Sequence, residues 1–401
     1  MTTRMTTDVP TSRARRVDDE WQLSLDTTRA IHYTVRNVRY GTAFDASSPV
    51  VAELVRGRQV LLVMDDSVSR LYGSQIVGYL SQNTRFLGFT IVSGAEADKT
   101  LGALEHVCRA LAAQGLDRNG VVVAVGGGVV LDIAGAAASL YRRGVRYLRV
   151  PTTIVGAVDV AVGIKQAVNF EKGKNLLGAF YPPIAAVVDR AFFQSLSGRA
   201  IACGIAEIIK MGLIRDRSLF VLLENYAKEL LRSKFATPER IAIDTVVLAQ
   251  AAMMDELEPN LFEDDLRRPV DFGHTFSPAM ETASNYTLPH GEAVAIDMRI
   301  STAIAVMRKL CPPETLDRLC SLYRDTDLPL HDSTCTVETL NKGLEDARKH
   351  RAGNLNLVVP TSVGSGTFVQ DVHLDELRLA ATLTSPMRTT HREGLGVNAR
   401  V

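Results

Sequence analysis

The sequence of 401 residues lacks the features that would assign it to a specialised class of protein. Its 45 basic and 45 acidic residues cancel, so no excess of one charge indicates a nucleic acid or an anionic membrane as partner. No apolar run approaches the roughly 20 residues needed to cross a bilayer. The cysteines are few, odd in number and without a CxxC pair, which favours reduced thiols in a cytoplasmic protein: Cys108, Cys203, Cys311, Cys320 and Cys335.

The two ends of the chain also lack distinctive features. Residues Met1–Arg16 mix Thr, Ser and Arg but contain no hydrophobic core of a signal peptide. We expect a disordered tail over residues 1–20 and a flexible tail over residues 386–401. The remaining length is sufficient for two domains with well-filled cores.

Short apolar runs alternate with longer amphipathic segments in the first half of the chain. The runs predict strands at Val60–Met64, Phe86–Val92, Gly120–Val125 and Tyr147–Val150. Apolar residues at helical spacing predict helices between them, at Ser69–Gln82 and Leu101–Gln114. Near-continuous apolar strands separated by helices indicate a parallel sheet covered on both faces, so we expect an α/β domain over residues 21–195.

The pattern changes near Asp189–Ser197, beyond which helices dominate. Helices are predicted at Ala200–Ile214, Leu219–Arg232, Pro238–Asp255, His274–Asn285, Gly291–Lys309 and Pro313–Tyr323. We therefore expect a second, mostly helical domain over residues 196–385.

A glycine triplet, Gly126–Gly128, follows a predicted strand and precedes a predicted helix. Glycines at such a turn let backbone N–H groups approach a pyrophosphate, whose charge is favoured at a helix N-terminus. The spacing differs from GxGxxG, and the triplet by itself fits a plain tight turn equally well. Asp65, at the end of a strand, suits a ribose hydroxyl, although a single Asp in that position is more often a helix cap.

A basic, glycine-punctuated stretch follows the strand that ends at Val150. It contains Lys165, Lys172, Lys174 and Asn175. Lysines, an amide and free backbone donors are the groups that bind a phosphoryl group. The alternative is an ordinary basic loop, but a solvated face does not usually confine its lysines to stretches punctuated by glycine.

Two histidines and a glutamate form a candidate metal site. His274 follows a glycine, His290 precedes one, and each is predicted to open a helix, whereas an isolated buried His is more often a core residue. Two imidazoles and the carboxylate of Glu207 leave coordination positions open for substrate oxygens, as in catalytic zinc sites. Lys210 lies three residues after Glu207, so both side chains can point into the same cleft.

In combination, these motifs resemble the sugar phosphate cyclase superfamily, which includes 3-dehydroquinate synthase. The resemblance covers the chain from about Val60 to Pro360. It is strongest in five segments: Gly126–Gly135, Pro151–Gly178, Gly204–Lys210, Asp271–Glu281 and His290–Val294. It implies an N-terminal NAD-binding α/β domain with a parallel sheet and a mostly α-helical C-terminal domain, with the active site between them.

The resemblance also assigns roles to individual residues. Zinc or cobalt would be bound by Glu207, His274 and His290. NAD would contact Asp65, Glu96, Lys99, Gly127, Gly128, Asp132, Thr152 and Thr153. A sugar phosphate substrate would face Asp159, Lys165, Asn175, Lys210, Arg267, Asp271 and Lys349, with Lys174 nearby. Arg143 would reach a phosphate, across the interface of a homodimer.

Two departures separate the chain from the dehydroquinate synthases themselves. Those enzymes usually continue the metal His as Gly-His-Thr-Phe-Gly-His, with an Asn three residues before it, where this chain has Pro278 and Asp271. They also bind a substrate carboxylate with a Lys that is missing here, since residues 242–256 contain no Lys or Arg. A desolvated carboxylate without a cationic partner is costly, which argues against dehydroquinate synthesis.

Four other segments resemble the sedoheptulose 7-phosphate cyclases: Leu131–Gly135, Ser139–Gly144, Glu258–Leu261 and His274–Pro278. That branch includes the 2-epi-5-epi-valiolone, 2-epi-valiolone and desmethyl-4-deoxygadusol synthases. The valiolone synthases commonly have Thr-Gly after the substrate Lys and the gadusol synthases Val-Ala, and Gln166 matches neither. The stereochemistry of the product therefore stays open.

The resemblance implies a cyclisation in which NAD is recycled. NAD⁺ oxidises a ring hydroxyl, phosphate leaves by elimination, the hydride returns, and an intramolecular aldol reaction closes a C7 cyclitol. A metal-dependent alcohol or glycerol dehydrogenase is the main alternative, but it would not need the residues of the phosphate site. A non-catalytic relative is a third alternative, disfavoured because the metal ligands and the cofactor glycines are all present.

Overall fold

The computed structural model describes residues 14–17, 20–23, 27, 30–171, 173–350 and 353–384. The chain divides into two compact units, residues 1–32 and 33–401. In the first unit, β1 (Ala14–Val17) pairs antiparallel with β2 (Glu20–Leu23), so strand structure begins inside the segment expected to be disordered. The predicted C-terminal tail and Lys172 lie outside the described residues.

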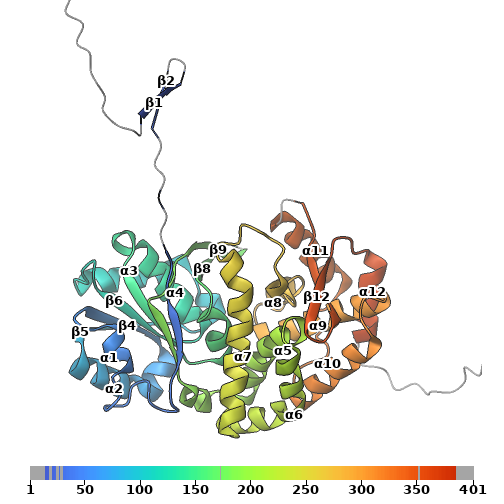
Figure 1. Ribbon diagram of the computed structural model, residues 1–401, viewed down its shortest axis with the longest axis horizontal. Coiled ribbons are helices and arrows are strands. Elements are labelled where there is room, and N and C mark those ends of the chain that lie inside the picture. The colour runs from blue at the N-terminus through green and yellow to red at the C-terminus, as the bar shows by residue number, and fades with distance from the viewer. Residues whose placement is uncertain are drawn as a thin grey trace, which may run out of the picture. The chain divides into compact units, whose positions relative to one another are not determined.

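The second unit begins with a six-stranded sheet in which every neighbouring pair is parallel (Figure 1). The strand order is β3-β10-β7-β6-β4-β5. The strands are β3 (Thr34–Asn37), β4 (Gln59–Asp65), β5 (Arg85–Val92), β6 (Val121–Gly126), β7 (Arg146–Pro151) and β10 (Ala185–Val188). All six residues of β6 are buried, as expected for a central strand covered on both faces. The predicted parallel sheet is therefore confirmed.

Helices cover both faces of this sheet. They are α1 (Val50–Leu54), α2 (Asp66–Asn83), α3 (Leu101–Ala113) and α4 (Gly128–Leu140). Val60, Leu62 and Met64 of β4 pack in the core beneath α1 and α2, whereas Leu61 and Val63 pack beneath α3 and α4. The alternation follows from the twofold period of a strand, which sends successive side chains to opposite faces.

An antiparallel hairpin of β8 (Lys165–Phe170) and β9 (Gly173–Phe180) packs against α4. It occupies the segment predicted to bind phosphate. At the hairpin tip, the backbone N–H of Asn169 donates to the carbonyl of Lys99 at 2.7 Å, next to the bridge between Thr100 and Asn169. This contact joins the hairpin to the segment between β5 and α3.

The rest of the unit is mostly helical, which confirms the predicted fold class. Its helices are α5 (Gly198–Ile214), α6 (Arg217–Ser233), α7 (Glu239–Leu257), α8 (Ser277–Ala283), α9 (His290–Met307), α10 (Pro313–Asp325), α11 (Val337–His350) and α12 (Leu374–Thr384). A hairpin of β11 (Leu357–Ser362) and β12 (Ser365–Val369) accompanies them. Helices α5 and α9 are buried along nearly all their length and pack closely, because a Cβ on Gly291 would lie 2.3 Å from the Cys203 carbonyl oxygen.

Short helical segments connect these elements. They are η1 (Glu96–Asp98), η2 (Tyr141–Arg143), η3 (Gly156–Val160), η4 (Arg190–Ser195), η5 (Glu258–Asn260) and η6 (Pro269–Asp271). The sequence does not predict them, nor α11, α12 and the two smaller hairpins of the second unit. Within the described part of the chain, no helix is both long and apolar enough to cross a membrane.

One predicted helix boundary is wrong. Helix α8 begins at Ser277, so His274 lies in the preceding turn and does not open the helix. The backbone N–H groups of Phe276 and Ser277 donate to the carboxylate of Asp297 on α9, at 2.5 and 2.9 Å. A carboxylate from a distant helix therefore caps α8, and it sets the start of the helix.

Candidate active site

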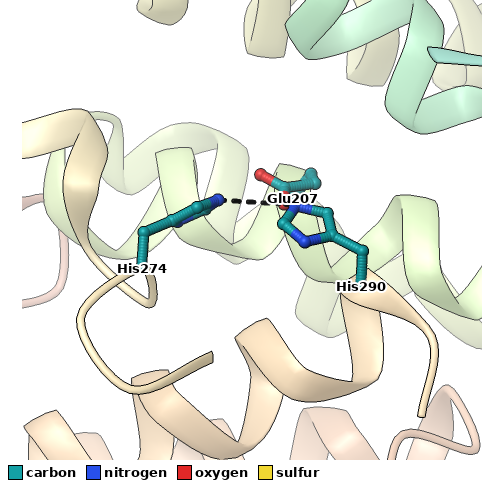
Figure 2. A group of neighbouring side chains, drawn as sticks. All are labelled: Glu207, His274 and His290. Atoms are coloured by element: carbon teal, nitrogen blue, oxygen red, sulfur yellow. Dashed lines mark ion pairs between the residues drawn. The ribbon is translucent and has the colours of Figure 1, made fainter. Parts of the chain in front are cut away.

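Glu207, His274 and His290 come together although they lie on three separate elements (Figure 2). Glu207 belongs to α5, His274 to the turn before α8, and His290 is the first residue of α9. One ligand atom from each lies within 4.8 Å of the others. The Glu207 Oε1 atom is 3.1 Å from His290 Nε2 and 3.7 Å from His274 Nε2. The structure thus places two imidazole nitrogens and one carboxylate around a common point.

The flanking glycines allow this convergence through close packing. Gly273 has a φ of +76°, and a Cβ there would lie 2.7 Å from Met298 Cγ on α9. On the other side, Gly291 presses α9 against the backbone of α5 at Cys203. Side chains at either position would push the turn of His274 or the start of α9 away from α5.

Each imidazole is oriented through its Nδ1 atom. His274 Nδ1 lies 3.0 Å from the Phe272 carbonyl oxygen, and His290 Nδ1 lies 2.9 Å from Glu281 Oε1. A carbonyl oxygen and a carboxylate only accept hydrogen bonds, so each Nδ1 carries a proton and donates it. The Nε2 atoms therefore face Glu207, which is the arrangement of metal-binding histidines.

The buried charges respond to one another. Burial lowers the pKa of His274 to about 4, helped by the charge of Lys210. Burial would lower the pKa of His290 as well, but the carboxylates of Glu281 and Glu207 outweigh it and raise the pKa to about 9. Burial opposes the ionisation of Glu281, yet His290 and Lys174 hold its pKa at about 2. The carboxylates therefore stay ionised beside the two rings.

Glu207 and Lys210 form a buried ion pair on one face of α5. Their charged atoms are 2.7 Å apart, and the side chains are 1% and 2% exposed. Burial disfavours the charge on Lys210, but Glu207 and Asp159 outweigh it and raise the pKa of the amine. Asp271 acts on the same amine in the same direction. Lys210 is therefore a protonated, water-shielded cation next to the two imidazoles.

The donor set fits a divalent metal ion. Both Glu207 oxygens are buried without a regular hydrogen bond from the described residues, and their partners are the ion pair with Lys210 and the two imidazoles. Two imidazole nitrogens and one carboxylate oxygen are typical ligands of a catalytic zinc ion, and a metal ion that binds here would displace the proton from His290 Nε2. A divalent cation at this point would satisfy the buried carboxylate.

The predicted cofactor residues gather where neighbouring strands end. Gly126 of β6 is in register with Pro151 of β7, so the turn into α4 lies next to Thr152 and Thr153. A Cβ on Gly127 would lie 3.2 Å from Thr153 Cγ2, which leaves the approach to the N-terminus of α4 open only with glycine. This is the carboxyl edge of a parallel sheet, where ligands of α/β proteins bind.

Three other predicted cofactor residues take part in contacts within the chain. Asp65 caps α2, because its Oδ1 atom accepts from the N–H groups of Ser67 and Val68 at 2.8 and 2.9 Å. Lys99 is buried and lies 2.5 Å from the carboxylate of Asp132. The structure therefore contains the helix cap considered as the alternative for Asp65. Only the Oδ1 atom of Asp65 accepts the two cap hydrogen bonds.

The hairpin tip contacts the cofactor side directly. Lys99 Nζ donates to the side-chain oxygen of Asn175 at 2.7 Å. The amide of Asn169 donates to Glu96 Oε1 at 2.9 Å, and its own oxygen accepts from the N–H of Asn175 at 2.8 Å. Asn175 is therefore brought to Lys99 and not to Lys165, although the sequence groups it with the lysine.

Lys165 belongs to a second group of charges, which we name the Lys165 cluster: Lys165, Glu263, Arg268 and Asp271. Lys165 Nζ is 2.7 Å from Glu263 Oε1, and the same oxygen pairs with Arg268. Arg268 also pairs with Asp271 at 3.1 Å. The cluster connects β8 to the loop between η5 and η6.

The structure gives two predicted substrate residues, Arg267 and Lys349, other neighbours, and it places Arg143 at the end of a short helical segment. The guanidinium of Arg267 lies 5.0 Å from the ring centre of Phe368 on β12. Lys349 pairs with Asp346 on the exposed face of α11 at 3.5 Å. Arg143 ends η2 with a φ of +64°. Their assignments to the substrate stay predictions from the resemblance.

Gln166, the residue that differs between the valiolone and gadusol synthases, points away from Lys165. Its side chain is buried, and its amide donates to the hydroxyl of Tyr147 and to the carbonyl of Tyr181 at 2.9 Å. Successive residues of β8 face opposite sides, so Lys165 and Gln166 cannot face the same cavity. Gln166 therefore acts on the site only through packing.

Four residues that the sequence analysis missed hold the site together: Glu281, Asp297, Glu263 and Arg268. Asp297 could have been found, because it is one of few charges in a mostly apolar helix, with Glu292 and Arg299, and lies two turns after His290. Glu281 lies on α8 and gives no such signal, since its partners Lys174 and His290 belong to other elements.

Comparison with known proteins identifies relatives of this chain. Residues 89–203 match the 3-dehydroquinate synthase N-terminal domain, and residues 204–350 match the C-terminal domain. A 2-epi-5-epi-valiolone synthase of Streptomyces glaucescens is 44% identical over 343 residues, which cover 84% of this chain and 88% of that protein. A 2-epi-valiolone synthase of Actinosynnema mirum is 37% identical over 332 residues, covering 81% and 85%.

A solved structure has the same fold. It is the 2-epi-5-epi-valiolone synthase of Streptomyces hygroscopicus subsp. jinggangensis, with NAD⁺ and Zn²⁺ bound. The two chains are 35% identical, with a TM-score of 0.86, and the match covers 90% of this chain and 99% of the other.

Proposed function

The chain belongs to the 3-dehydroquinate synthase family, and from this premise we propose that it is a sedoheptulose 7-phosphate cyclase. The product is a C7 cyclitol, 2-epi-5-epi-valiolone or its epimer 2-epi-valiolone, formed with release of phosphate. The observation that carries the proposal is the convergence of Glu207, His274 and His290 beside the buried cation Lys210. Identity of 44% to a 2-epi-5-epi-valiolone synthase supports the substrate class.

We propose NAD and a zinc or cobalt ion as cofactors. When bound, NAD⁺ accepts and returns a hydride, and the divalent ion makes a coordinated hydroxyl group more acidic. Glu207, His274 and His290 would hold the ion. The residues that would hold NAD lie at the sheet edge and around the start of α4: Asp65, Glu96, Lys99, Gly127, Gly128, Asp132, Thr152 and Thr153. The α/β domain, about residues 21–195, would thus be the NAD-binding domain.

The chain's own residues supply charge stabilisation and positioning. Lys210 is protonated and shielded from water, so it offsets negative charge that develops on substrate oxygens next to the imidazoles. Asp159 and Asp271 act on the Lys210 amine and keep its charge. Lys165 is the cation that reaches solvent from β8, and it is suited to the phosphate group of the substrate.

The geometry also supports the exclusion of a carboxylated substrate. Glu256, at the end of the segment that lacks Lys and Arg, pairs with Arg215 at 3.0 Å. The charge of Arg215 is therefore already offset by that of Glu256. Pro278 occupies the first turn of α8, where it offers neither a charge nor a side-chain donor. Binding a desolvated carboxylate without a free cation would be unfavourable.

We further propose a cytoplasmic homodimer. All five cysteines are free thiols, which suits a reducing compartment. Leu140 at the end of α4 is 61% exposed and directly precedes η2, so an exposed apolar side chain lies next to the segment that ends in Arg143. A partner subunit that covered Leu140 would lie next to Arg143. Arg143 would then reach the phosphate site of that partner subunit.

One experiment tests the proposal. Purified protein is incubated with sedoheptulose 7-phosphate, a catalytic amount of NAD⁺ and Zn²⁺ or Co²⁺. We expect one phosphate per cyclitol, many turnovers per NAD⁺ and no net NADH, with the epimer identified by NMR. Stoichiometric NADH without phosphate release would indicate a dehydrogenase, and turnover of the carboxylated heptulosonate would indicate a dehydroquinate synthase.

A further inference from the structure

A continuous line of charged groups connects the hairpin to the candidate metal site. Lys174 Nζ of β9 lies 2.6 Å from Glu281 Oε2, and Glu281 Oε1 lies 2.9 Å from His290 Nδ1. His290 Nε2 in turn lies 3.1 Å from Glu207 Oε1. Four elements, β9, α8, α9 and α5, each contribute one member. Each contact in this line joins two elements that are separate in the sequence, so it depends on the tertiary packing.

Glu281 is unusual because it is almost fully buried and uses its two oxygens for different partners. The side chain is 3% exposed, with Lys174 on one oxygen and the imidazole on the other. Burying a carboxylate is costly unless its partners satisfy it. A side chain that was present only for stability could be replaced by an apolar one at little cost, so the pairing with an imidazole indicates a task for the charge.

The two histidines differ in this respect. His274 donates to a neutral backbone carbonyl, that of Phe272, two residues away. His290 donates to an ionised carboxylate, which makes its ring a stronger electron donor and restricts its rotation. The neutral contact of His274 is supplied by the local turn, whereas the contact of His290 depends on α8 and β9 together.

We propose that Glu281 is a positioning residue that holds His290 with Nε2 toward Glu207. Lys174 acts through Glu281, by holding its second oxygen, and not by contacting substrate. Lys174 thus differs in role from Lys165 on the same hairpin. The proposal rests on the proposed function of Glu207, His274 and His290 as a metal site.

The test measures metal binding in the full chain stripped of metal. Affinity for Zn²⁺ is determined by chelator competition, and Co²⁺ is added as a spectroscopic probe of the ligand sphere. Glu281→Ala should weaken Zn²⁺ binding by about 10–100-fold and alter the visible spectrum of bound Co²⁺. Glu281→Gln, which retains an oxygen acceptor, should weaken binding less, and Lys174→Met less again.

Glu292→Gln is the matched control. Glu292 lies two residues from His290 on α9, but its carboxylate pairs with Arg199 and not with an imidazole. This variant should keep the Zn²⁺ affinity and the Co²⁺ spectrum of the unmodified protein. If Glu281→Ala fails to fold by circular dichroism, Glu281→Gln carries the test with the same readouts.

The outcomes separate this proposal from the proposed function. Unchanged Zn²⁺ affinity and an unchanged Co²⁺ spectrum in the folded Glu281 variants overturn the positioning role, even if the protein cyclises its substrate. Equal losses in the Glu281 and Glu292 variants also overturn it, because they would indicate a general loss of packing. An unmodified protein that binds neither ion overturns the metal site itself.

Discussion

Two groups of charges lie near the candidate active site, and one lysine of each, Lys210 and Lys165, differs from the other in its exposure to water. The first, the Glu207 cluster, comprises Glu207, Lys210, His274, His290, Glu281 and Lys174, and it is held between packed helices and β9. Glu207 and Lys210 are almost completely buried. The Lys165 cluster lies between a hairpin and a loop. Its Glu263, Arg268 and Asp271 side chains are 14%, 15% and 19% exposed, whereas that of Lys165 is 56% exposed.

This difference in burial decides what each group can do. Charges in a low-dielectric interior interact strongly and are costly to leave unpaired, so the Glu207 cluster has one stable arrangement. An ion pair in contact with water contributes about 0–1 kcal/mol and is easily exchanged for another partner. In the proposed function, the first group is therefore preorganised for a metal ion and an oxyanion, and the second can release Lys165 to an incoming phosphate.

The largest effect is expected from breaking the buried pair. Glu207→Gln removes the anion paired with buried Lys210 and leaves only the more weakly acting Asp159 and Asp271, and the loss of one partner of a buried pair costs about 3–5 kcal/mol. We expect the free energy of unfolding of the metal-free protein to fall by that amount in urea titrations, and zinc binding to be lost.

An exposed pair provides the control for this variant. Glu105→Gln breaks the pair with Arg109 on α3, in which both side chains are more than half exposed. It should change the free energy of unfolding by less than about 0.5 kcal/mol. Equal effects of the two variants would contradict the expected difference between a buried and an exposed ion pair.

The sequence predicts the two groups unequally well, for physical reasons. The strands of the sheet are recognisable because they are buried on both faces, as β6 shows. The metal ligands are recognisable because close helix packing requires glycine next to His274 and His290. These signals are local, so a single sequence contains them.

The contacts that complete the site are not local. Glu281 meets Lys174 across 107 residues, and Glu263 meets Lys165 across a comparable interval. The hairpin of β8 and β9 has mostly exposed positions on β9, so it lacks the apolar pattern of a strand. The start of α8 depends on Asp297, some twenty residues further along the chain.

The second prediction concerns Asp297, which holds the turn of His274 in place. Burial raises the pKa of Asp297 to about 6, although the N–H groups of Ser277 and Phe276 lower it. The folded protein thus binds this proton more tightly than the unfolded chain, where an Asp titrates near 3.9. The resulting stability is complete below about pH 4 and is lost as the pH rises through about 6.

Asp297→Asn should remove this dependence. Subtracting the free energy of unfolding of the variant from that of the unmodified protein should give a curve that falls by about 3 kcal/mol between pH 4 and pH 7. Urea titrations across this range measure it. Asp244→Asn, at the exposed pair with Arg240 on α7, is the control. A flat difference curve for Asp297→Asn would contradict the prediction.

The third prediction concerns Lys165, the exposed member of the Lys165 cluster. Lys165→Ala should slow phosphate release by about 10–100-fold, since a charge-assisted contact to a bound phosphate is worth about 1.5–3 kcal/mol. Its effect on the free energy of unfolding should stay below about 0.5 kcal/mol, because the side chain is largely in water. Lys342→Ala on α11 is the control and should leave turnover unchanged. A Lys165 variant that is strongly destabilised would show that this cluster, too, is structural.

The smallest effect is expected for Glu263→Gln. This variant tests whether Lys165 can exchange its partner Glu263 for a phosphate group. The carboxylate of Glu263 pairs with the amine of Lys165, the group that we expect to bind phosphate. Arg268 has a second partner, Asp271, and would keep it if Glu263 were replaced. Glu263→Gln removes the competing charge, so inorganic phosphate should bind more tightly, by at most about fivefold, since the exposed pair is worth no more than about 1 kcal/mol. Calorimetric titration with phosphate measures this change, and Glu105→Gln should show none.

A gain of tenfold or more would mean that the Glu263 pair is stronger than a solvent-exposed ion pair. Weaker phosphate binding would mean that Glu263 orients Lys165 for the phosphate, in which case the Lys165 cluster is preorganised in the same way as the Glu207 cluster.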